Sequence, residues 1–108
     1  ISYGGHNRIE GNHVTALGVG IHLAGTSGNS VILDNVVAGC DLGLKVDSSV
    51  NFIARNIARN NQNKNFEIVS GNRAGSIVVP PTSGAITNVG TGQSKGVGST
   101  DPWANISF

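Results

Sequence analysis

Four polar side chains recur at a spacing that would gather them on one surface. His22, Lys45 and Glu67 follow one another at intervals of about 22 residues, and Asp47 lies two positions after Lys45. An imidazole, an amine and carboxylates can transfer protons in an enzyme, or hydrogen-bond the hydroxyl and carboxylate groups of a sugar. We therefore predict a carbohydrate-binding site at His22, Lys45, Asp47 and Glu67. The plainer alternative is a solvated polar row with a Lys45–Glu67 ion pair.

The remaining reactive side chains match no catalytic or metal-binding pattern. A calcium-dependent lyase needs several converging carboxylates, and a glycoside hydrolase needs two facing carboxyl groups. In the expected stacking, the neighbours of Asp47 are Ala24 and Val69, and neither is acidic. The three histidines have no metal-ligand spacing: His6, His13 and His22. We predict no catalytic residue, no metal site and no cofactor, and we expect Cys40, the only cysteine, to be a small buried residue.

Composition argues against two classes of partner. The net charge is +1 and charged residues make up 12 % of the chain, so there is no basic stripe of the kind that binds nucleic acid. No apolar run approaches the roughly 18 residues that a membrane-spanning helix needs. The chain starts at Ile1 and contains no Met, so we expect a processed or excised segment of a longer protein.

A repeat of about 22 residues must position these side chains. Its three copies run from Asn7 to Asn72, and each places apolar residues at every second position of one segment, the strand period. These segments are 19–23, 42–46 and 65–68, with Lys64 expected just before the third. A fixed period stacks equivalent strands in parallel, and parallel crossovers are right-handed. The sequence therefore predicts an all-β, right-handed, single-stranded parallel β-helix of three to four short rungs.

One corner of each rung carries an asparagine. Asn12, Asn35 and Asn56 recur at the repeat period. We predict that they stack as a structural ladder in which the side-chain amides hydrogen-bond along the axis and tolerate a left-handed backbone at the turn. Asp34 and Arg55, just before two of these asparagines, are expected to pair with each other.

The repeat degrades toward the carboxyl end. We predict β-helix rungs over residues 1–79, with core repeats at 7–72, and an irregular capping tail over 80–108. Residues 76–79 would add a strand of a fourth rung, and 85–89 a final edge strand. A solenoid end exposes core side chains and unpaired backbone. We expect the apolar residues of the tail to cover that end: Trp103, Ile106 and Phe108.

These rungs resemble a known family. The pattern Asn-x-Ile-x-x-Asn-x-Val followed by Gly-Ile-x-Leu, at 7–14 and 20–23, is similar to the parallel β-helix repeat of the pectin-lyase-like superfamily. Asn35 with the segment 43–46 matches it again. The superfamily includes polysaccharide lyases, polygalacturonases, pectin methylesterases, alginate epimerases, phage tailspikes and adhesins, so the resemblance implies the fold more than the activity. The Asn-x-Asp, Asp-Asp and Gly-His-Gly motifs of its inverting hydrolases do not occur in this sequence.

Two function classes follow from this. The first is a non-catalytic module of an extracellular bacterial or phage protein, whose role is structural or is to present a face that binds a carbohydrate or another partner. The alternative is a fragment of a carbohydrate-active enzyme (lyase, hydrolase or epimerase), or one whose site forms between subunits. In either case we expect a secreted or cell-surface protein. We also expect a homo-oligomer that associates through the uncapped solenoid end or a lateral face.

Overall fold

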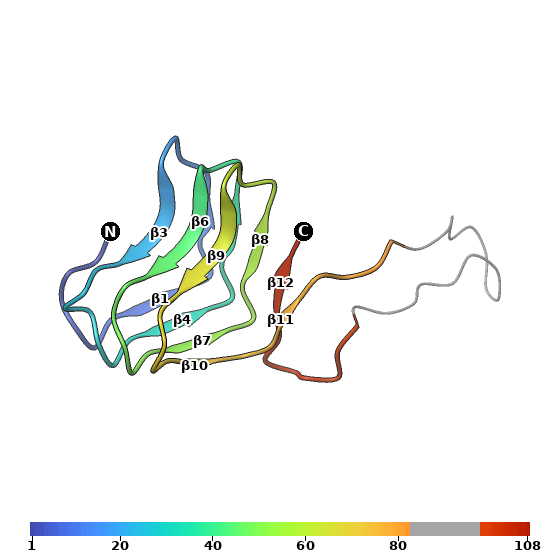
Figure 1. The fold of residues 1–108 in the computed structure, drawn as a ribbon. Helices are drawn as coiled ribbons and strands as arrows, with labels where there is room; N and C mark the ends of the chain where they lie inside the picture. The colour runs from blue at the N-terminus through green and yellow to red at the C-terminus, as the bar shows by residue number, and fades with distance from the viewer. Residues whose placement is uncertain (83–97) are drawn as a thin grey trace.

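The computed structural model describes residues 1–82 and 98–108, and over these residues the chain is an all-β parallel β-helix (Figure 1). The first sheet contains β1 (Arg8–Glu10), β4 (Val31–Leu33), β7 (Phe52–Ala54) and β10 (Arg73–Ala74). The second contains β2 (His13–Val14), β5 (Val36–Ala38), β8 (Ile57–Arg59), β12 (Asn105–Ser107) and β11 (Ile77–Val78), in that spatial order. The third contains β3 (Val19–Leu23), β6 (Leu42–Val46) and β9 (Lys64–Ile68). The predicted fold class is confirmed.

The register between rungs follows the repeat. Every pairing between these strands is parallel, and Leu23, Val46 and Ile68 occupy equivalent positions on β3, β6 and β9. Alternation along each strand sends one set of side chains inward. The inward residues form a continuous core whose fully buried members are Leu23, Ile32, Val37, Leu44, Val46 and Ile53. Cys40 packs in the same core with 1 % of its surface exposed.

The corner asparagines form a hydrogen-bonded stack. The Asn12 amide donates to Oδ1 of Asn35 at 3.0 Å, and the Asn35 amide donates to Oδ1 of Asn56 at 2.9 Å. The expected left-handed backbone lies one residue earlier than the asparagines, at Gly11, Asp34 and Arg55, whose φ angles are +68°, +56° and +53°. At each corner, one residue therefore adopts the left-handed backbone of the turn, and the next residue supplies the stacked amide.

A second asparagine stack, not predicted from the sequence, lies at the corner before the first sheet. The side-chain amide of Asn51 donates to Oδ1 of Asn72 at 3.0 Å, and the backbone N–H of Ser30 donates to Oδ1 of Asn51 at 2.9 Å. Ser30 Oγ in turn accepts the backbone N–H of Asn7 at 3.1 Å. Both corners are thus held by side chains that accept hydrogen bonds from the preceding rung.

The fourth rung differs from the expectation. Strand β11 lies in the expected segment, but it does not pair with β8; β12 from the end of the chain lies between them (Figure 1). Asn105 at the start of β12 continues the first ladder, because its Oδ1 accepts the Asn56 amide at 3.1 Å. The end of the tail is therefore a strand of the solenoid, not an irregular cover. The edge strand expected at 85–89 lies outside the described residues.

The three expected cap residues lie at different depths. Trp103 is 45 % exposed and packs edge-on against Phe52, with 5.7 Å between ring centroids. Ile106 is half-buried in β12 and paired with Ile57. Phe108 is 56 % exposed, and its backbone joins the tail to β8 by donating to the carbonyl of Ala58.

One strand boundary predicted from the sequence is wrong. Strand β9 begins at Lys64, which is paired with Leu42, whereas the polar side chain had placed the start one residue later. Backbone pairing with β6 holds Lys64 in the strand while its side chain extends into solvent. Within the described residues, no helix is long and apolar enough to cross a membrane.

Candidate functional site

The predicted polar site lies on the outer face of the third sheet. His22, Lys45 and Glu67 are direct register partners on β3, β6 and β9, as strands of equal phase in successive rungs require. Their side chains are 20 %, 31 % and 39 % exposed, and that of Asp47, just past the end of β6, is 35 % exposed. The structure thus brings all four residues to one half-exposed surface, which we call the polar face.

The ion pairs on the polar face run differently from the expected pairing. Asp47 Oδ2 lies 2.7 Å from His22 Nε2 and 3.6 Å from Lys45 Nζ. Glu67 pairs with Lys64, with 3.6 Å between Oε2 and Nζ. The expected Lys45–Glu67 pair is not among the ion pairs of the described residues. Side chains of about this length reach neighbours along their own strand as easily as across the sheet, so the register alone did not decide the partner.

Hydrogen bonding lowers the pKa of one carboxyl group on the polar face. The bond from His22 holds the pKa of the Asp47 carboxyl below its ordinary value, and the charge of Lys45 acts in the same direction. Asp47 is therefore an acceptor that stays ionised at neutral pH. An ionised carboxylate, an imidazole and an ammonium group side by side can hydrogen-bond several hydroxyls of one sugar.

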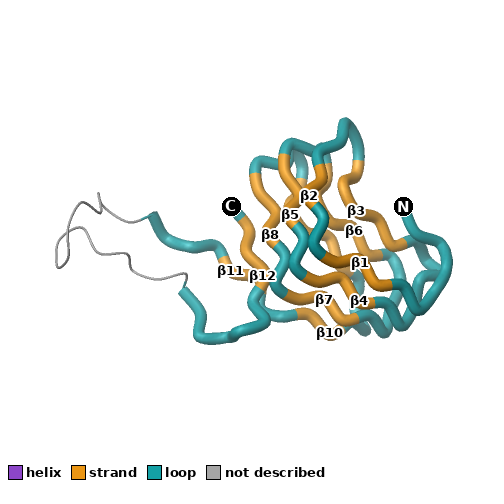
Figure 2. The backbone as a smooth tube through the Cα atoms, turned by 180° about the vertical axis from the view of Figure 1, so that it is seen from behind, coloured by secondary structure: helices purple, strands orange, loops and turns teal. Residues whose placement is uncertain are grey.

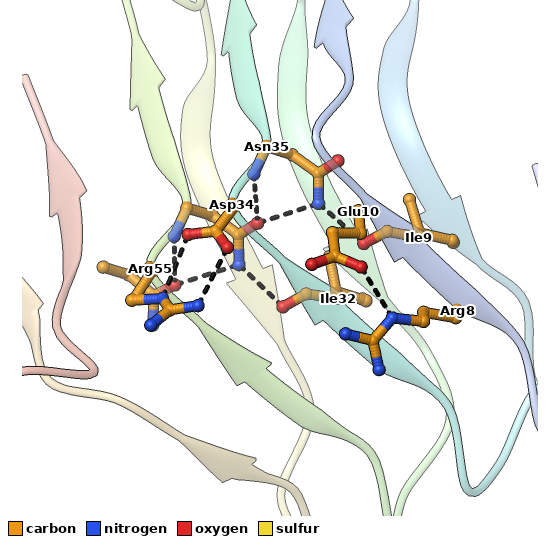
Figure 3. Close-up of polar contacts among 9 residues, drawn as sticks. Arg8, Ile9, Glu10, Ile32, Asp34, Asn35 and Arg55 are labelled. Atoms are coloured by element: carbon orange, nitrogen blue, oxygen red, sulfur yellow. Dashed lines mark hydrogen bonds and ion pairs between the residues drawn. The ribbon is translucent and has the colours of Figure 1, made fainter.

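Carboxyl groups on the first sheet are neutralised by arginines. Arg55 binds Asp34 through two parallel hydrogen bonds, Nε to Oδ1 at 3.0 Å and Nη2 to Oδ2 at 2.9 Å (Figure 3). This confirms the pairing expected from the sequence. Figure 3 also shows Arg8 bound to Glu10, at 2.6 Å. The Arg55 guanidinium lies 4.9 Å from the centre of the Trp103 ring, so the pair also supports the tail. Each of these two carboxylates is therefore held by an arginine.

A cavity that the sequence did not predict lies on the first sheet. It has a volume of about 460 Å³, and its walls include Val31, Phe52 and Arg73. These three are register partners on β4, β7 and β10, in the outward-facing column that Arg8 begins. Figure 2 shows this sheet from behind the view of Figure 1. An aromatic residue in an outward position of a polar repeat was the available signal.

Comparison with protein families gives one match. The model of the family described as "Periplasmic copper-binding protein (NosD)" matches residues 1–80. No curated protein matches the chain, and no solved structure does. The matched residues include all three repeats of the sequence together with β10 and β11.

Copper would need nitrogen or sulfur ligands that converge on one point. The sequence has no Met, its one thiol (Cys40) is 1 % exposed within the core, and His22 meets a single carboxylate, that of Asp47. Among the described residues, no three His, Cys, Asp or Glu side chains gather, and the sequence of 83–97 contains none of these types. The residues present do not fit a resident copper centre. With most of its length matched and a β-helix fold, the chain nevertheless belongs to the NosD family.

Proposed function

We propose that this chain is a non-catalytic β-helix module that works outside the cytoplasm and binds polysaccharide along the polar face. The observation that carries the proposal is the register of His22, Lys45 and Glu67, which spaces three polar groups by about 4.8 Å per rung. A polymer lying across the strands would meet one such group at each rung. The family's description as periplasmic agrees, at a coarse level, with a location outside the cytoplasm.

The enzyme alternative has weaker support. The carboxylate of Asp47 is occupied by His22 and Lys45, and that of Glu67 by Lys64. A general acid of the glycosidase type needs a raised pKa, whereas the pKa of Asp47 is lowered. The polar face is therefore better suited to holding a sugar than to transferring a proton to it.

Binding to polygalacturonate and alginate tests the proposal. We expect the triple variant His22→Gln, Lys45→Gln, Glu67→Gln to bind these polymers at least about tenfold more weakly, since it removes the Lys45 cation, the His22 imidazole and the Glu67 carboxylate that accepts hydrogen bonds from sugar hydroxyls. The matched control is Arg59→Gln, on β8 of a different sheet. Calorimetric titration gives the affinities, and circular dichroism verifies that the variants fold. Unchanged binding by the triple variant would show that the polar face is not the site.

Self-association stays a prediction. At the amino-terminal rung, large apolar side chains are exposed: Ile1, Tyr3, Leu17 and Val19. We propose that a second copy covers them. Size-exclusion chromatography with light scattering distinguishes a dimer or larger oligomer from the 11.0 kDa monomer, and a monomer at high concentration would contradict the proposal.

A further inference from the structure

The polar face leaves the cavity on the first sheet unexplained. Its volume of about 460 Å³ lies in the range of about 300 to 1,000 Å³ that holds small ligands. It opens beside the outward column of the sheet, and its rim is formed by the corner residues Asn29, Val50 and Gly71. This position is on a different sheet from the polar face.

The cavity offers an apolar floor. Phe52 and Val31 lie side by side in register on β7 and β4, and Val50 at the rim is 59 % exposed. Phe52 is held in place by the edge-on ring of Trp103. Val50 adopts a left-handed backbone at φ +64°, where its stacked neighbours are Asn29 and Gly71, types that tolerate it. A branched residue costs stability in that conformation, so the apolar side chain at the rim carries a local energetic penalty.

The cavity also offers one cation. Arg73 is exposed, and among the described residues its guanidinium makes no ion pair. Arg8, at the other end of the same outward column, is bound to Glu10, and Arg55 is bound to Asp34. None of the side chains lining the cavity carries a carboxylate. Arg73 is thus the guanidinium positioned for an anion from outside.

We infer that this cavity binds a carboxylated sugar, one uronate residue of a polysaccharide. The C–H face of the pyranose ring packs on Phe52 and Val31, and the carboxylate takes the planar guanidinium of Arg73 through two parallel hydrogen bonds. Asn29 at the rim is available to a ring hydroxyl. The inference takes its ligand class from the proposed function but places this sugar on a different sheet.

Trigalacturonate is the probe, with its methyl ester as the uncharged match. Trp103 is the only tryptophan and contacts Phe52, so its fluorescence reports occupancy and calorimetry gives the affinity. We expect Arg73→Gln to weaken binding of trigalacturonate by about tenfold or more, and the wild type to bind the methyl ester about as weakly. Phe52→Leu, which keeps the bulk and removes the aromatic face, should also weaken it. Arg8→Gln, from the same column, should leave it unchanged.

The proposals for the cavity and for the polar face can be contradicted independently of each other. A protein in which Arg73→Gln loses trigalacturonate, while the His22, Lys45, Glu67 triple variant keeps it, supports the cavity. The inference is overturned if Arg73→Gln binds like the wild type, or if the methyl ester binds equally well, even where the triple variant loses the polymers and so upholds the proposed function. A wild type that binds neither the trimer nor the polymers overturns both proposals.

Discussion

The amide ladder and the polar face are both stacks of polar side chains repeated from rung to rung. In the ladder, Asn35, Asn56 and Asn105 are fully buried, and each amide is hydrogen-bonded to its neighbours. On the polar face, His22 and Lys45 keep 20 % and 31 % of their side chains in solvent. The difference lies in burial. A polar group sealed from water is costly to leave unpaired, whereas one that water can reach is replaceable.

This contrast separates stability from recognition. The buried amides of Asn35, Asn56 and Asn105 hold the rungs in register and admit no ligand, because they have no exposed surface. The polar face contributes little to holding the rungs together, and its groups are free to exchange partners with a sugar. Substitutions in the ladder should therefore destabilise the protein, whereas substitutions on the polar face should change ligand binding.

The largest effect is expected from Asn56→Ala. Asn56 donates to the Ile32 carbonyl and to Asn105, and its Oδ1 accepts from both nitrogens of Asn35. Loss of the amide leaves several buried groups unpaired, so we expect a loss of about 3 kcal/mol or more in the free energy of unfolding. Urea denaturation measures it. If the alanine variant does not fold, Asn12→Ala at the exposed end of the ladder gives a smaller loss, because water can replace its amide. Asn63→Ala, at an exposed asparagine, is the control.

The second effect concerns the tail strand that completes the ladder. A Cβ atom at Gly75 would overlap the backbone carbonyl of Trp103, so Gly75→Ala must displace the tail. We expect a loss of about 1 to 3 kcal/mol, with a red shift of Trp103 emission as its ring loses its contacts with Phe52 and Arg55. Gly25→Ala, where an added Cβ meets open space, should leave both unchanged. A Gly75→Ala protein with native emission and stability would contradict the seating of the tail.

A third effect tests the same tail by pH. Asp101 accepts the backbone N–H groups of Ser76 at 3.0 Å and Trp103 at 2.9 Å, and these bonds lower its pKa. A lowered pKa gives stability that is present above the ordinary aspartate value of about 3.9 and is lost as the pH falls through the folded value. We expect Trp103 emission to shift in that acidic range. Asp101→Ala should show the shifted emission already at neutral pH. Wild-type emission in that variant would show that Asp101 does not hold the tail.

The smallest effect is expected on the polar face. The Lys64–Glu67 pair joins half-exposed side chains at 3.6 Å, and exposed pairs contribute about 0.2 to 1 kcal/mol. Lys64→Gln should therefore change the free energy of unfolding by less than about 1 kcal/mol, and salt should reduce the difference further. A loss as large as that of Asn56→Ala would remove the distinction between the two stacks.

Much of the fold could be predicted because the same local sequence pattern occurs three times. The period gave the parallel stacking, and the recurring residue types gave the positions of Asn12, Asn35 and Asn56. The ion pairs of the polar face were harder to predict. The strand period places His22, Lys45 and Glu67 in register, but the partners of Asp47 depend on rotamers that no pattern specifies. The start of β9 was predicted wrongly for a related reason. Backbone pairing with β6 places Lys64 in the strand, although lysine has a low strand propensity.

By itself, the sequence determined the rungs of the β-helix, because a period of two within each strand and a fixed period between strands leave one way to bury the apolar residues. Only the tertiary structure decided how the last rung is completed. Asn105 is hydrogen-bonded to Asn56, 49 residues earlier in the chain. The tail does not continue the repeat, so the sequence pattern does not predict this contact. The cavity beside Phe52 and Arg73 also depends on tertiary packing, since residues from three successive rungs line it and Trp103 of the tail packs against Phe52. Contacts made once, between segments distant in the chain, leave no repeat in the sequence to read.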